Sequence, residues 1–188
     1  DKLLPTVISR CVLVPFHPLK KETCLNVALQ EGIDEEDAFL LTRVVSKTKD
    51  YMSIVVSNAY QNAKTMLKQY IGVKGNPRLL LVDYDVRYKV QAKDTDGNAK
   101  DENIDLVKMF LMLLGQFYKD TFVELKDAPD WYAYALQKEK ERSTNIQRVK
   151  LLEITQKELN LCNRTNDLNL LLDQAIYEME EIKYGRSH

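Results

Sequence analysis

The side chains that usually perform acid–base or nucleophilic chemistry are few in this sequence and are not grouped. Its only histidines are His17, which stands between a phenylalanine and a proline, and His188, the last residue. No sequence cue brings a nucleophile and an orienting carboxylate to either of them, as a catalytic triad would need. The phosphate-loop motif GxxxxGK[ST], the dinucleotide motif GxGxxG and the zinc motif HExxH are all absent. We therefore expect the chain not to be an enzyme with a site of its own.

One stretch has the spacing of a calcium-binding loop. Asp94, Asp96 and Asn98 would occupy alternate positions, and Asp105 would be the twelfth residue. The sixth position of such a loop needs a glycine for its sharp turn, and here it is Ala99. The twelfth position also lacks the long bidentate glutamate. We expect a solvated loop here, no metal site, and no cofactor anywhere in the chain.

The composition is that of an ordinary soluble domain. With 27 basic and 28 acidic residues the net charge is −1, so no overall field attracts the chain to nucleic acid or to an anionic membrane. No apolar run approaches the roughly 20 residues that cross a bilayer. The cysteines, Cys11, Cys24 and Cys162, are odd in number and far apart, which argues against a disulfide framework or a zinc site. These features predict a cytoplasmic protein, in which Cys24 and Cys162 are small buried apolar residues.

Helical spacing of apolar residues predicts three helices in the first third of the chain. The first spans 18–31 and ends at Gly32. The second begins after Asp34, whose side chain can cap the backbone N–H of Asp37. The third spans 50–71. Three helices of this length form a small bundle.

The middle of the chain gives conflicting signals. Glycine, asparagine and proline within 72–77 form the clearest boundary in the sequence. In 82–90 valine and tyrosine alternate with charged residues, which is the pattern of a half-buried strand. No second alternating run lies nearby to pair with it, so both a helix and a short strand remain open for this segment. The polar stretch 92–103 is predicted to be a loop.

The second half of the chain predicts a larger bundle of four or five helices. A strongly apolar helix follows the loop, capped by Asn103 or Asp105, and its aromatic residues Phe110, Phe117, Tyr118 and Phe122 are expected to belong to the core. Further helices are predicted at 131–142, 143–162 and 167–184. The charged run 137–142 interleaves acids with bases and is expected to be a solvated helix face. The fold class is therefore mainly α, with a possible short strand near 82–90.

The first residues resemble a known motif. The segment LLPTVISRC, which ends in Ser9, Arg10 and Cys11 and leads into VLVPF, resembles the end of the ATPase domain in clamp-loader subunits of the AAA+ class. In that family the arginine of this motif acts as a finger on ATP that is bound by the neighbouring subunit. A guanidinium supplied in this way stabilises charge on the transferred phosphoryl group. The resemblance assigns this role to Arg10.

The resemblance also implies a domain organisation. Residues 1–12 would be the remnant of an AAA+ ATPase domain, 13–75 a helical lid domain, and 76–188 a helical collar that joins subunits into a pentamer. Within the collar, the segment 109–122 contains Tyr118, Lys119 and Asp120, where related subunits have an aromatic or Tyr/Arg-Asp pattern. The segment 163–179 is similar to the last collar helix.

The lid favours one kind of subunit over another. Subunits that hydrolyse ATP have a Gly-Ser-x-Arg-x-Ala segment in the lid, and the corresponding SKTKDYMS at 46–53 has neither the glycine nor the arginine. This favours a delta-prime-like subunit of bacterial DNA polymerase III, which does not hydrolyse ATP itself. The chain would then be the C-terminal part of that subunit.

The implied function is to help place the sliding clamp on primed DNA during replication. The expected partners are the other clamp-loader subunits, gamma/tau and delta, through the collar; the clamp and primer–template DNA would be contacted only in the full assembly, and no membrane is involved. Two alternatives remain open. One is a gamma/tau or replication factor C small subunit, and the other is a helical scaffold protein that is unrelated to ATPases.

Overall fold

The computed structural model describes residues 20–72, 77–89, 98–165 and 167–185, and within these residues every regular element is a helix. In chain order the elements are α2 (Lys21–Gln30), α3 (Glu35–Val44), η1 (Thr48–Asp50), α4 (Tyr51–Val55), α5 (Asn58–Ile71), α6 (Pro77–Asp83), η2 (Tyr84–Tyr88), α7 (Asn98–Asp120), α8 (Asp130–Arg142), α9 (Asn145–Leu161) and α10 (Leu168–Tyr184). The prediction of a mainly α fold is confirmed.

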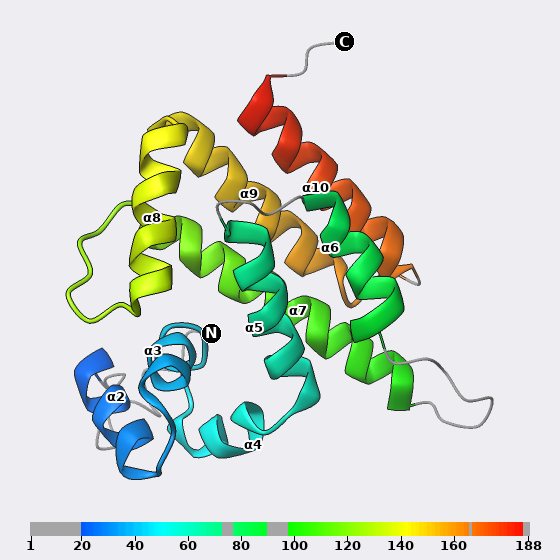
Figure 1. Ribbon diagram of the computed structural model, residues 1–188. Coiled ribbons are helices and arrows are strands. Elements are labelled where there is room, and N and C mark those ends of the chain that lie inside the picture. Colours follow the sequence, from blue (N-terminus) through cyan, green and yellow to red (C-terminus); the bar gives the residue numbers. More distant parts are fainter. Residues whose placement is uncertain (1–19, 73–76, 90–97, 166, 186–188) are drawn as a thin grey trace, which may run out of the picture.

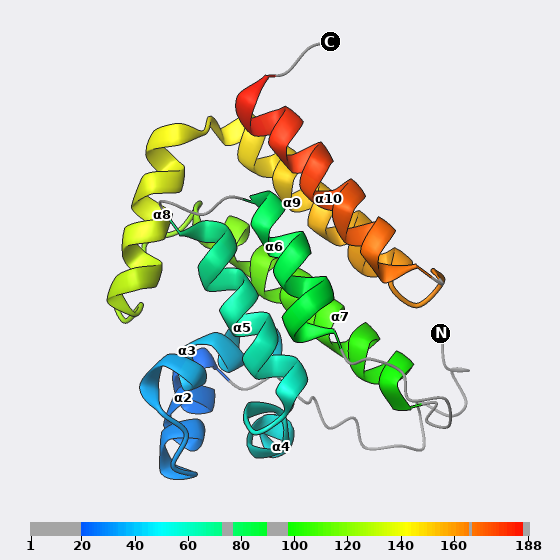
Figure 2. The same ribbon diagram turned by 45° about the vertical axis from the view of Figure 1, so that its right-hand side comes forward.

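Helix α7 is the centre of the arrangement (Figure 1). It packs against α5 on one side and against α9 on the other, and α9 pairs with α10 in an antiparallel hairpin. Helix α6 lies between α5 and α10 in both views (Figure 2). The short helices α2, α3 and α4 gather at one end of the molecule. One continuous apolar core runs through these elements, from Cys24 of α2 to Met179 of α10.

Local signals explain where the first helices begin and end. Helix α2 is followed by Gly32, whose φ of 83° is in the left-handed region that glycine adopts without strain. The backbone N–H of Ile33 donates to the carbonyl of Ala28 at 3.1 Å, which completes a Schellman motif. Helix α3 then begins after Asp34, whose carboxylate accepts from the N–H of Asp37 at 3.0 Å. Both predicted signals are confirmed.

The predicted helix over 50–71 is wrong in one respect, because it is two helices. The Ser57 hydroxyl accepts from the N–H of Tyr60 at 3.2 Å and caps α5, so the backbone turns between Val55 and Asn58. The side-chain amide of Gln61 donates to the carbonyl of Val55 at 2.7 Å and holds this turn. Serine favours such a cap because its oxygen satisfies an N–H that the first helical turn leaves unpaired.

The possible strand near 82–90 is wrong for the residues that the structure describes there. These residues form the end of α6 and the π-helical η2. In a strand Val82, Tyr84 and Val86 would share one buried face, but only Tyr84 is buried, and the two valines are 58% and 72% exposed. The tyrosine lies four residues after the buried Leu80, which is helical spacing. Packing against α5 and α10 decides the conformation, since the described residues include no strand with which this segment could pair.

Two expectations about α7 also need correction. The helix begins at Asn98, so Asn103 and Asp105 lie inside it and do not cap it, and part of the predicted loop 92–103 is helical. Asp94 and Asp96 of the calcium-like pattern lie outside the described residues. Phe110, Phe117 and Tyr118 are buried as predicted, but Phe122 follows the end of α7 and is 45% exposed.

The last three helices lie close to their predicted limits. Helix α9 has a capping box, in which Thr144 and Gln147 bind each other's backbone N–H groups. Helix α10 is capped by Asp167 and ends at Gly185, which has a φ of 59°. Cys24 and Cys162 are buried free thiols, as predicted, and burial raises the pKa of Cys162 to about 11. None of the described helices has both the length and the apolar composition that crossing a membrane requires.

Candidate functional site

The residues predicted from the sequence to form a site, and the collar pattern that accompanies them, fall in two places. Ser9, Arg10 and Cys11 lie outside the described residues, so the arginine-finger assignment stays a prediction. Tyr118, Lys119 and Asp120 form the last turn of α7. The described residues of the collar pattern therefore lie at one end of the central helix, and the candidate site is centred on Asp120.

Asp120 is the centre of a polar cluster that joins three helices. Its side chain is 2% exposed and accepts four hydrogen bonds. Arg43 of α3 donates through Nε at 2.8 Å and through Nη2 at 2.5 Å, which is a bidentate arrangement. The hydroxyl of Tyr132, from α8, donates at 2.9 Å, and the amide of Gln116, one turn earlier in α7, donates at 2.6 Å. We call these four residues the Asp120 cluster.

Aromatic rings hold the members of this cluster in place. The guanidinium carbon of Arg43 lies 4.9 Å from the centroid of the Phe39 ring, one turn back in α3. The Tyr132 ring makes edge-to-face contacts with Phe39 at 5.2 Å and with Phe117 of α7 at 5.5 Å. Arg43 is also in the last turn of α3, where a cation is favoured by the negative end of the helix dipole. Helix packing and charge therefore direct the donors to one carboxylate.

The chemistry of the Asp120 cluster suits it to holding helices together. Burial raises the pKa of the Tyr132 hydroxyl far above its ordinary value, and the charge of Asp120 and the hydrogen bond to it raise it further. The hydroxyl therefore stays protonated and donating. A carboxylate whose two oxygens accept from an arginine, a tyrosine and an amide is not free to take a proton from a substrate. The arrangement orients helices and offers no general base.

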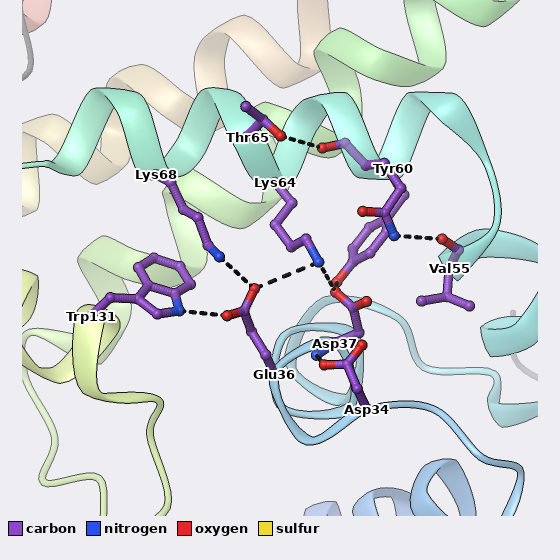
Figure 3. A network of polar contacts seen from close by, with 10 residues as sticks. Asp34, Glu36, Asp37, Val55, Tyr60, Lys64, Thr65, Lys68 and Trp131 are labelled. Atoms are coloured by element: carbon purple, nitrogen blue, oxygen red, sulfur yellow. Dashed lines mark hydrogen bonds and ion pairs between the residues drawn. The ribbon is translucent and has the colours of Figure 1, made fainter.

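A second cluster occupies the start of α3 (Figure 3). The carboxylate of Asp37, which is buried, accepts from Lys64 Nζ at 2.6 Å and from the Tyr60 hydroxyl at 2.7 Å, both on α5. The neighbouring Glu36 points toward α8, where it accepts from Trp131 Nε1 at 2.9 Å, and it is 2.7 Å from Lys68 Nζ. These six residues, which we call the Glu36–Asp37 cluster, join α3, α5 and α8.

Hydrogen bonding sets the protonation states in the Glu36–Asp37 cluster. Burial on its own would raise the pKa of Glu36, but hydrogen bonds from Lys68 and Trp131 outweigh it and hold that pKa below its ordinary value. Burial would lower the pKa of Lys64, but the hydrogen bond and charge of Asp37 raise it overall. Both groups are therefore held in their charged forms. The cluster, like the first, is made of satisfied ion pairs.

Neither the scan against protein-family models, nor the search of curated proteins, nor the search of solved structures found a match for this chain.

A cleft of about 210 Å³ opens beside the Asp120 cluster, between α7 and α9. Its wall contains two cations, three other polar side chains and no carboxylate. The lining residues are Arg43, Val44, Leu111, Met112, Gly115, Gln116, Lys119, Leu152, Thr155, Gln156 and Leu159. Arg43 and Gln116 belong both to the Asp120 cluster and to the cleft wall. The hydrogen bonds of the cluster therefore fix the position of two polar side chains that line the cleft.

A third buried ion pair is an exception within the run 137–142, which was expected to be a solvated helix face and is otherwise largely exposed. Glu139, which lies in this run, is buried, and its carboxylate accepts from Lys183 Nζ of α10 at 3.1 Å. The Lys183 ammonium also lies 5.2 Å from the centroid of the Tyr70 ring and 5.6 Å from that of Tyr118. Alternating charges on a helix indicate exposure only where no other element covers them. Here α10 covers one of the acids.

The sequence pattern missed most members of these clusters. It singled out Asp120 but gave no role to Arg43, Gln116 or Tyr132. Arg43 is 77 residues from Asp120 and leaves no local signal. The spacing of four residues between Gln116 and Asp120 was a signal that could have been used. Within residues 20–72, 77–89, 98–165 and 167–185, no group of three or more histidine, cysteine, aspartate or glutamate side chains could hold a metal ion. What the described residues do offer is a set of helix-joining ion pairs and one cationic cleft.

Proposed function

We propose that this chain is a non-catalytic helical subunit of the AAA+ clamp-loader family, similar to the delta-prime subunit of bacterial DNA polymerase III. The observation that carries the proposal is the segment LLPTVISRC, which contains Arg10 and precedes a described part of the chain whose regular elements are all helices. In this role Arg10 would be offered to ATP on a neighbouring subunit. The chain would act in the cytoplasm, with the other clamp-loader subunits as partners and no cofactor of its own.

The two clusters support a mechanical role within such an assembly. Arg43 and Asp120 link α3, in the proposed lid, to α7, in the proposed collar, and Glu36 and Trp131 link α3 to α8. Ion pairs with little exposure are directional and costly to separate, so helices joined in this way move together. A force applied near the start of the chain by a nucleotide-bound neighbour would reach the collar through these contacts.

The proposal is tested by reconstitution with candidate gamma/tau and delta subunits from the same organism. The full product of its gene should elute with them as one stoichiometric complex. Arg10→Ala should lower the ATPase rate of that complex at least tenfold without changing its elution, because an arginine finger acts on the chemical step. The exposed Arg164 provides a matched control, and Arg164→Ala should leave the rate unchanged. Failure to form a complex with any of these subunits would refute the proposal.

A second function, that of a protein-binding scaffold unrelated to ATPases, is favoured by a different observation. Leu79, Val82 and Val86 form an apolar stripe along α6 and η2, and they are 55%, 58% and 72% exposed. Exposed apolar residues at helical spacing mark surfaces that other proteins cover. For a scaffold, Val82→Glu would abolish capture of its partner while Arg10→Ala would have no effect. The opposite pattern of effects supports the clamp-loader role.

A further inference from the structure

The cleft between α7 and α9 lies at a point where the two helices approach closely. A Cβ atom at Gly115 of α7 would lie 3.0 Å from the Thr155 hydroxyl oxygen of α9, which is closer than side chains normally come. The helices therefore touch at this glycine. The opening of about 210 Å³ lies beside the contact, with the end of α3 as its third wall.

The cleft has a positive wall with unused donors. The two hydrogen bonds from Arg43 to Asp120 use Nε and Nη2, so the two N–H groups of Nη1 donate to no other described residue. Lys119 is exposed on the same wall and forms no ion pair with a described residue. Because Asp120 offsets one of these two cations, the local balance is one positive charge. That balance suits a ligand with a single negative charge.

The remaining wall of the cleft is apolar. Leu111 and Met112 contribute from α7, and Leu152 and Leu159 contribute from α9. A ligand with only a charged group would leave this surface in contact with water, and a wholly apolar ligand would bring no acceptor to the Nη1 donors of Arg43 or to the Lys119 ammonium. Pockets of this kind use a few fixed polar groups to orient a mainly apolar ligand.

The size of the cleft limits the ligand. An apolar cavity of roughly 150 Å³ holds one benzene molecule, so 210 Å³ has room for about six to ten non-hydrogen atoms. We propose that the cleft between α7 and α9 binds a small organic monocarboxylate with an apolar body. The carboxylate lies against Arg43 and Lys119, and the carbon chain lies along the leucines and Met112. This site is independent of the clamp-loader role.

The test is a calorimetric titration of the full chain with hexanoate, alongside hexan-1-ol as the uncharged analogue. Hexanoate should bind saturably at one site, and hexanol should bind at least tenfold more weakly. Lys119→Gln should weaken hexanoate binding three- to tenfold, because it removes one of the two cations. The exposed Lys150, on the opposite face of α9, provides the matched control, and Lys150→Gln should change nothing. Low salt should strengthen binding of the carboxylate alone.

A variant that fills the cleft provides a second test. Met112→Trp places a larger side chain in the half-buried wall and should abolish hexanoate binding, with circular dichroism and thermal unfolding used to show that the helices remain folded. The proposal is overturned if hexanoate shows no saturable binding at millimolar concentration. It is equally overturned if hexanol binds as well as hexanoate, or if the folded Met112→Trp protein binds hexanoate as the wild type does.

Discussion

Replacement of Asp120 by asparagine should be among the most destabilising single changes in the described part of this protein. Asparagine keeps the shape of the side chain but removes its charge, and its NH₂ group would face donors that now have no acceptor. Arg43, which is 12% exposed, would be left as an uncompensated charge, and either Tyr132 or Gln116 would lose its partner. Breaking a buried ion pair by removing one partner costs about 3–5 kcal/mol.

Variants of the Asp120 cluster should lower the free energy of unfolding by different amounts, in an order that the structure predicts. Tyr132→Phe removes one neutral hydroxyl that donates to a charged group, and such a hydrogen bond contributes about 1.5–3 kcal/mol. Asp120→Asn should therefore cost more than Tyr132→Phe. The paired change Arg43→Met with Asp120→Leu removes both charges, so it should cost less than Asp120→Asn alone, since no unpaired charge remains.

The assay is equilibrium unfolding in urea, with the free energy of unfolding extrapolated to water for each variant. Asp173 is exposed on α10, and Asp173→Asn should change the free energy of unfolding by less than about 0.5 kcal/mol. If Asp120→Asn were no more destabilising than Asp173→Asn, the conclusion that the Asp120 cluster holds α3, α7 and α8 together would be refuted. It would also be refuted if the paired change cost more than the single one.

Three further predictions concern the cap of α5, the contact of α7 with α9, and the dependence of stability on pH. Ser57→Ala removes the cap of α5 and should lower the free energy of unfolding by about 1 kcal/mol in urea, whereas Ser57→Asp should restore it. Gly115→Val should cost about 1–3 kcal/mol, because its side chain would be forced against Thr155, and Gly115→Val combined with Thr155→Ala should recover part of that loss in thermal unfolding. Because hydrogen bonds from Lys68 and Trp131 outweigh the effect of burial and hold the pKa of Glu36 below its ordinary 4.5, its carboxylate stabilises the fold above that pH, and the contribution is lost as pH falls through the folded-state pKa. Wild type should therefore exceed Glu36→Gln in stability at pH 7, and the difference between their free energies of unfolding should shrink as pH falls below 4.5; a difference that stayed constant as the pH fell would contradict the assignment.

Helix limits that depend on neighbouring residues could be predicted from the sequence. Gly32 and the Asp34 cap act within four or five residues of themselves, so their effect is visible in the sequence and is confirmed in the structure. Ser57 acts over the same short range, but it stands in a run with unbroken helical periodicity, so the break between α4 and α5 was missed. A cap in the middle of a periodic stretch competes with helix continuation, and local pattern does not decide between them.

The segment 82–90 shows a different limit. Alternation of Val82, Tyr84 and Val86 with charged residues favours a strand only if one face is covered and another strand supplies hydrogen bonds. In the described structure the backbone bonds are made within α6 and η2, and the covering elements are the helices α5 and α10. The tertiary structure does not cover the side chains of Val82 and Val86, so these two valines stay exposed.

The position of Asp120 does carry a signal that sequence reasoning could use. It is the last residue of α7, where the negative end of the helix dipole disfavours a carboxylate, and it follows a helix that is apolar on most of its faces. Burial and the dipole both oppose an isolated negative charge at this place. An acidic residue there persists only with cationic or hydrogen-bonding partners from other elements. The sequence can therefore predict that a partner exists, although only the packing of α3 beside α7 shows that the partner is Arg43.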